Sequence, residues 1–134
     1  MADRVFLDTS VVIRYLAEDD PPRAFVAASL IDGQETVVIS TGVLLEALHV
    51  LRTAFGATNP ALGEALINLL SKRNVELADA DAAAVVSGIT RTLRLSARRI
   101  PDAILAASAE QAACDWIATF DEGFASPTVP SRLL

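Results

Sequence analysis

The sequence has too few cysteines for a disulfide, since Cys114 is the only one in 134 residues. An intrachain disulfide is therefore impossible, and we expect the protein to work in a reducing compartment. The chain also lacks a signal-peptide core, because Asp3, Arg4 and Asp8 place charges in its first residues. No uncharged apolar run approaches the roughly 18 residues that a membrane-spanning helix needs. These absences predict a soluble, cytoplasmic protein with no membrane partner.

An excess of positive charge is also missing. The formal net charge is −6 and Lys72 is the only lysine, which argues against a simple basic nucleic-acid binder. A nuclease is not excluded, because a bound metal ion would offset carboxylates clustered in its site. Apolar residues, by contrast, make up 52% of the chain. Either a partner covers part of that apolar surface, or helices are buried on several sides.

Apolar runs alternate along the chain with amphipathic stretches. Strands are expected at residues 5–7, 36–40, 75–78 and 116–120, with a weak last strand at 129–134. Helices are expected at residues 10–17, 23–31, 41–55, 59–72, 82–95 and 103–113. This alternation predicts an α/β fold whose mostly parallel central sheet of four or five strands is covered by helices. The length fits a single domain, residues 1–134, with one core.

Asp8 is the first candidate functional residue. It follows the apolar run Val5-Phe6-Leu7, which is typical of a buried strand. Ligands of open α/β sheets bind at the carboxyl ends of the strands, so Asp8 is expected to face the binding crevice. Asp8 is also placed to cap the helix that follows it.

Three further acids fall at comparable positions. Glu46 lies more than one turn inside the helix after the second strand, Asp102 opens a helix, and Asp121 ends the fourth strand. Parallel topology brings strand ends and the following helix starts to one edge of the sheet. Each acid also has a plainer interpretation: Glu46 in a solvated stripe, Asp102 as a cap, and Asp121 in a turn.

Converging carboxylates require a compensating charge. Two of them about 4 Å apart repel by roughly 4 kcal/mol at an effective dielectric constant of 20. Such a cluster needs a bound cation, or at least one proton held with raised, coupled pKa values. Oxygen ligands without histidine or cysteine suit Mg²⁺ or Mn²⁺. The chemistry that fits is metal-assisted hydrolysis of a phosphodiester.

Small hydroxyls and a basic cluster lie near these acids in the sequence. Thr9, Ser10 and Thr119 are placed to orient carboxylates, or simply to bond the local backbone. The basic cluster directly precedes Asp102 and is placed to hold phosphates, unless it is only a solvated face. It consists of Arg91, Arg94, Arg98 and Arg99.

Other residues that often carry chemistry have plainer interpretations. His49 is the only histidine, and it is expected to be structural because nothing places it near a nucleophile. Cys114 is expected to be a small buried apolar residue. Leu62, Leu66, Leu69 and Leu70 recur at helical spacing and are expected in the core or at a dimer surface.

Four segments, taken together, carry a family likeness. They are Val5-Phe6-Leu7-Asp8-Thr9-Ser10, Glu46 after Ile39-Ser40, Asp102-Ala103-Ile104-Leu105-Ala106-Ala107 and Thr119-Phe120-Asp121-Glu122-Gly123-Phe124. In this order and spacing they resemble the PIN domain, and more narrowly the VapC-type toxins of bacterial and archaeal toxin–antitoxin pairs. The likeness covers nearly the whole chain, although the family's late strand is barely recognisable in residues 128–134.

The resemblance implies a three-layer PIN fold and a Mg²⁺- or Mn²⁺-dependent endoribonuclease. It implies that Asp8 and Asp102 are the firmest metal ligands, that Glu46 binds directly or through water, and that Asp121 is the acid whose role varies most. Ser10 and Thr119 match the family's supporting polar positions. The resemblance also implies an RNA substrate, a homodimer and inhibition by a cognate VapB-type antitoxin.

A different class of function stays open from the sequence. A PIN-like module can bind RNA or protein without catalysis, and loss of one or more of the acids would mark such a case. Asp8, Glu46, Asp102 and Asp121 are all retained, which favours the enzyme.

Overall fold

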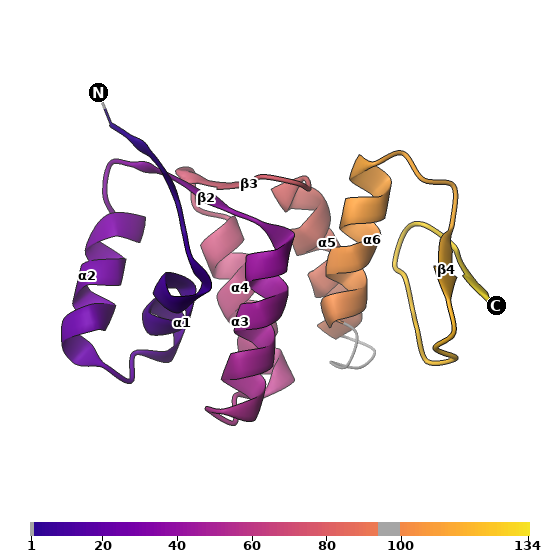
Figure 1. The fold of residues 1–134 in the computed structure, drawn as a ribbon, viewed down its shortest axis with the longest axis horizontal. Helices are drawn as coiled ribbons and strands as arrows, with labels where there is room; N and C mark the ends of the chain where they lie inside the picture. The colour runs from indigo at the N-terminus through magenta and orange to yellow at the C-terminus, as the bar shows by residue number, and fades with distance from the viewer. Residues whose placement is uncertain (1, 94–99) are drawn as a thin grey trace.

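The structure is a computed structural model that describes residues 2–93 and 100–134 (Figure 1). Its strands are β1 (Arg4–Phe6), β2 (Thr36–Ile39), β3 (Val75–Leu77), β4 (Ile117–Thr119) and β5 (Ser131–Leu133). Its helices are α1 (Thr9–Ala17), α2 (Pro21–Ile31), α3 (Thr41–Thr53), α4 (Asn59–Leu70), α5 (Ala82–Leu93) and α6 (Ile100–Gln111). The predicted α/β class is confirmed, and every expected element overlaps an observed one.

The main sheet is parallel and has the strand order β1-β2-β3. Phe6 pairs with Val38 of β2, and Val38 pairs with Glu76 of β3. All strands of this sheet therefore end at the same edge. Asp8 follows β1 there, and Ser40 follows β2. Polar side chains therefore lie at the edge where ligands of open α/β sheets bind.

The strands do not form the single sheet of four or five that was expected. β4 and β5 pair in parallel as a separate two-stranded sheet, so this part of the prediction is wrong. The chain between them is held by the last helices: the Arg91 Nη1 group donates to the Pro127 carbonyl at 3.1 Å, and the Ala125 amide donates to Asp102 Oδ2 at 3.1 Å. In Figure 1, β4 lies at the opposite end of the long axis from β1.

Local capping explains where the first helices begin. Asp8 accepts from the Ser10 amide at the start of α1, and Asp20 accepts from the Arg23 amide at the start of α2. Ser40 and Thr58 cap α3 and α4 in the same way. Such side chains satisfy amides that the first helical turn leaves unpaired.

Asp79 and Asp81 both lie between β3 and α5, and they bond different helices. Asp81 accepts from the Ala83 amide at 3.2 Å and caps α5. Asp79 instead binds the first residue of α3, accepting from the Thr41 amide at 2.9 Å and from its hydroxyl at 2.6 Å. This bond joins the end of β3 to the start of α3.

The core lies between the parallel sheet and the helices. The leucines at positions 62, 66, 69 and 70, expected in the core or at a dimer surface, are buried within the single chain and belong to the core. Cys114 is exposed, so the expectation of a buried cysteine is wrong. It lies just beyond α6, in the connection that leads out to β4. No described helix has the length and apolar character to cross a bilayer.

The only lysine ties three helices together. Lys72, after α4, forms a 2.7 Å ion pair with Asp32 at the end of α2, and the Tyr15 hydroxyl of α1 donates to the same carboxylate at 3.0 Å. The Lys72 hydrogen bond is the main cause of a lowered pKa at Asp32. For the same reason the pKa of Lys72 is raised.

We predict that Asp32→Asn lowers the free energy of unfolding at neutral pH. The loss should stay below about 1 kcal/mol, because the Lys72 and Asp32 side chains are 30% and 49% exposed. Since the pKa of Asp32 is lowered on folding, its contribution is present above the unfolded value of about 3.9 and is lost as the pH falls through the folded value. Urea unfolding at pH 7 and in stronger acid should therefore show a difference from wild type that shrinks with acid. Asp115→Asn, at an exposed position, is the control, and a difference independent of pH would contradict the assignment.

Candidate active site

Asp8 stands at the carboxyl end of β1 with its carboxylate held by Ser10. The Ser10 hydroxyl donates to Asp8 Oδ2 at 2.6 Å and the Ser10 amide donates to the same oxygen at 3.2 Å. Asp8 is therefore the cap of α1, as its plainer interpretation proposed. A carboxylate has about four lone-pair sites, so two bonds to one oxygen leave it able to bind a cation as well.

Glu46 reaches the same place from α3. The hydroxyl of Thr9, the residue next to Asp8, donates to Glu46 Oε2 at 2.9 Å. Thr9 is only 6% exposed, whereas Glu46 is exposed. A buried hydroxyl thus holds an exposed carboxylate, which is the arrangement expected of a positioned ligand rather than of a solvated stripe.

Asp102 and Asp121 lie outside the main sheet. Asp102 lies in the first turn of α6 and binds the Ala125 amide. Asp121 follows β4, where its amide donates to the Thr119 hydroxyl at 3.0 Å and its carboxylate accepts from the Gly123 amide at 2.8 Å. Thr119 therefore supports the turn by accepting a hydrogen bond from the Asp121 amide, and this bond does not involve the Asp121 carboxylate.

The four acids do not converge in this arrangement. Within residues 2–93 and 100–134, no group of three or more acids, histidines or cysteines lies close enough to hold a metal ion together. The expectation of a single cluster is therefore not met, because β4 does not join the main sheet beside β1. The roles assigned to Asp8, Glu46, Asp102 and Asp121 stay predictions.

The pKa of Asp8 is determined mainly by its hydrogen bonds from Ser10. Its pKa is lowered, mainly because the Ser10 hydroxyl donates to the carboxylate and secondly because the Ser10 amide does. The sequence predicted that at least one acid of a crowded cluster holds a proton with a raised pKa, and Asp8 is not such an acid. Asp8 is consequently ionised at neutral pH.

The donors at Asp8 and Glu46 suit a hard divalent cation. Two carboxylates, with the hydroxyls of Thr9 and Ser10 beside them, supply oxygen and no nitrogen or sulfur. Mg²⁺ commonly binds proteins through one or two carboxylates, with water and substrate phosphate completing its shell. These donor types therefore suit a divalent cation, although these two acids belong to no larger metal-binding group among the described residues.

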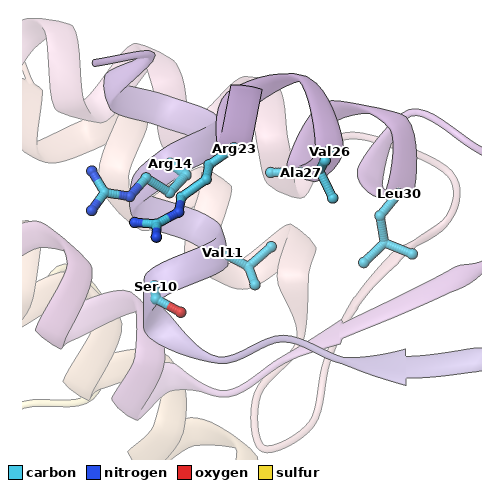
Figure 2. Close-up of a pocket in the computed structure, with 7 residues that line it drawn as sticks. All are labelled: Ser10, Val11, Arg14, Arg23, Val26, Ala27 and Leu30. Carbon is cyan, nitrogen blue, oxygen red and sulfur yellow. The ribbon is translucent and has the colours of Figure 1, made fainter. Parts of the chain in front are cut away.

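The nearby positive charges differ from those that the sequence suggested. Of the expected basic cluster, Arg91 bonds the Pro127 carbonyl, and Arg94, Arg98 and Arg99 lie outside the described residues. A pocket of about 370 Å³ between α1 and α2 is instead lined by Ser10, Arg14 and Arg23 together with apolar side chains. Figure 2 shows both guanidinium groups on the Ser10 side of this pocket. The sequence analysis missed Arg14 and Arg23. The signal that could have found them is their place on the two helices that directly follow Asp8.

His49 is exposed, and its backbone carbonyl accepts from the Thr53 hydroxyl at 2.7 Å. This contact uses only the backbone of His49, so the expectation of a structural histidine stays a prediction.

Comparison with known families decides the broad assignment. A family model described as the PIN domain matches residues 5–128. The chain belongs to the PIN domain family. No curated protein in the comparison matches it. PIN domains are generally nucleases that cleave RNA and typically bind divalent metal ions, so membership gives the edge at Asp8 and Glu46 a nuclease-type context.

We predict that Ser10→Ala raises the pKa of the Asp8 carboxyl toward its ordinary value, because the main cause of the lowered pKa is the Ser10 hydroxyl. The retained Ser10 amide bond should keep part of the shift. Carboxyl carbon chemical shifts followed through an NMR titration measure the change. Thr9→Val removes the hydroxyl that binds Glu46 and is the matched control, with the Asp8 pKa unchanged. An unaltered Asp8 titration in Ser10→Ala would refute this cause.

Proposed function

We propose that the protein is a Mg²⁺- or Mn²⁺-dependent endoribonuclease, the toxin of a VapBC-type toxin–antitoxin pair acting in the cytoplasm. The observation that carries the proposal is the anchored pair of carboxylates at one sheet edge in a PIN domain. Asp8 is held by Ser10, and Glu46 is held by the buried Thr9. Family membership supports RNA cleavage.

The proposed chemistry is hydrolysis of a phosphodiester bond without a covalent enzyme intermediate. A divalent cation, when bound, supplies a Lewis acid that activates water and stabilises developing charge on the phosphate. Asp8 and Glu46 hold that cation, and Thr9 and Ser10 fix the orientation of the two carboxylates. Asp102 and Asp121 are the remaining proposed ligands.

Arg14 and Arg23 are proposed to receive RNA beside this site, because they line the pocket that Ser10 also lines. Arg14 already forms hydrogen bonds of 3.0 and 2.9 Å with both oxygens of Asp19. Arg23 is more available: its side chain is 71% exposed and lies 3.6 Å from Asp20. An exposed guanidinium can bind a phosphate through two parallel hydrogen bonds.

The proposal extends to partners. A VapB-type antitoxin and a second copy of the chain are the proposed protein partners. Large exposed apolar side chains support this, among them Phe25 at 74% and Val26 at 68% on α2. Surface of this kind is common where a protein meets a partner.

One observation favours a second candidate, a PIN-like module that binds RNA or protein without cleaving RNA. No three acids lie together among the described residues, so the four acids that the resemblance assigns to a metal site are not gathered in one group. Activity of a matched pair of variants separates the two candidates.

We predict that Asp8→Asn abolishes metal-dependent RNA cleavage while the protein stays folded. Asparagine is as good a helix cap as aspartate, so α1 should be retained, but the neutral amide binds a divalent cation far more weakly. Wild type and variant are compared on total RNA with Mg²⁺, with Mn²⁺ and with a chelator, and by growth of an inducible bacterial host.

Asp115→Asn is the matched control, because Asp115 is exposed and has no part in the proposed site. Cleavage by Asp8→Asn at the wild-type rate, with circular dichroism unchanged, would reject the catalytic assignment and favour the binding module.

We also predict that Arg23→Ala weakens RNA binding without changing the cleavage rate at saturating RNA, since the residue would contact phosphate and not the reacting atoms. The slope of log affinity against log salt should fall by roughly one. Arg73→Ala is the control, because Arg73 precedes β3 at the opposite edge of the sheet. A lower cleavage rate with unchanged affinity would contradict the assigned role.

A further inference from the structure

The pocket between α1 and α2 lies directly beside Asp8. Its volume of about 370 Å³ falls at the lower end of the roughly 300–1,000 Å³ that small-molecule sites occupy. Ser10 lines this pocket, and the hydroxyl of the same residue donates to Asp8 Oδ2 at 2.6 Å. A ligand in the pocket would therefore be separated from the candidate site by one shared side chain.

The pocket has a charged end and an apolar end (Figure 2). The guanidinium groups of Arg14 and Arg23 lie at the end near Ser10. The rest of the lining that the structure describes is apolar and consists of Val11 on α1 with Val26, Ala27 and Leu30 on α2. The ligand that complements this lining is amphipathic, with an anionic group next to an apolar body.

Two acids partly offset the charge of these arginines. Arg14 donates from Nη1 to both oxygens of Asp19, at 3.0 and 2.9 Å, and Arg23 lies 3.6 Å from Asp20. Both arginines keep donors for an anion, because a guanidinium has five N–H groups. The acids nevertheless weaken binding that depends on phosphate charge alone, so burial of the apolar part of the ligand has to supply the rest.

We propose that this pocket takes up an unstacked base of the RNA, while Arg14 and Arg23 bind the phosphates that flank the base. The inference rests on the proposed function, under which the scissile phosphate lies at Asp8 and Glu46. RNA offers a flat base beside an anionic backbone at every nucleotide, and proteins commonly hold splayed-out bases between apolar or aromatic side chains. A base held here would fix the adjoining phosphodiester beside Asp8.

The lining also indicates how the pocket would select its ligand. The Ser10 hydroxyl already donates its hydrogen to Asp8, and the apolar end offers no side-chain partner to the hydrogen-bonding edge of a base. Burying that edge unpaired would cost free energy, so it has to face the open side of the pocket. We therefore expect removal of the base to weaken binding far more than exchange of one base for another.

Nuclear magnetic resonance with a mononucleotide tests the base site without reference to RNA cleavage. Adenosine 5′-monophosphate is added, without metal, to wild-type protein that carries labelled methyl groups. We expect millimolar binding and nuclear Overhauser effects from the base protons to the methyl groups of Val11, Val26 and Leu30. Ribose 5-phosphate, which has the phosphate and no base, is the matched ligand control and should bind about ten-fold more weakly.

Two results would overturn the base site. Equal affinity for the two ligands, without contacts from the base protons to these methyl groups, would show that only phosphate binds at the arginines. Absence of any contact at the highest soluble nucleotide concentration would favour an apolar side chain of a partner protein as the occupant of the pocket.

A filled pocket provides the matching variant. Ala27 is buried and lines the pocket, so Ala27→Leu should weaken binding of adenosine 5′-monophosphate by about ten-fold. Ala28→Leu makes the same change at the next residue of α2, which lines a different pocket shared with α4, and should bind as wild type does. Wild-type affinity in a folded Ala27→Leu would refute the proposal. The two-ligand comparison needs only wild type and decides the question if Ala27→Leu does not fold.

Altered RNA separates this inference from the proposed function. A single-stranded oligoribonucleotide that the protein cuts is made with one abasic nucleotide at each position in turn. We expect one position next to the cut to lower kcat/KM by about ten-fold, and equal cleavage at every position would overturn the base site. Base contacts in a protein that cuts no RNA with Mg²⁺ or Mn²⁺ would uphold the base site while the ribonuclease assignment failed.

Discussion

The hydrogen bond from Thr9 to Glu46 is the contact on which the candidate site depends. It joins the first residue of α1 to the second turn of α3, two helices that start at neighbouring strand ends of one parallel sheet. Thr9 is buried, so its hydroxyl has no water as an alternative partner, and a buried donor left unpaired is costly. A buried residue of the core thereby holds an exposed carboxylate in place, and Asp8 directly precedes that residue in the chain.

The sequence predicted what local chemistry determines. Ser40 and Thr58 cap helices where the sequence places their starts, and the β-branched run at β2 forms a buried strand. Asp8 was readable both as a cap and as a ligand, and its two bonds from Ser10 show why these interpretations are compatible. Capping fixes the direction of the carboxylate, and a fixed carboxylate binds a cation with less loss of conformational entropy.

Long-range pairing is where the sequence was insufficient. The sequence of residues 117–119 does not determine whether β4 pairs with β1 or with β5. A three-residue strand has too few side chains to specify its neighbour. The same limit applies to Asp79, whose bond goes to Thr41, remote in sequence and adjacent in the fold. Cys114 was misjudged for the related reason that burial depends on what packs against a segment, and α6 ends before it.

The separation of the acids has a physical logic in a chain of net charge −6. Four carboxylates held together without a cation would repel one another, and part of their charge would be lost to protonation. Keeping Asp8 apart from Asp102 and Asp121 leaves it ionised, with a pKa lowered by Ser10, so a cation can bind there without first displacing a proton.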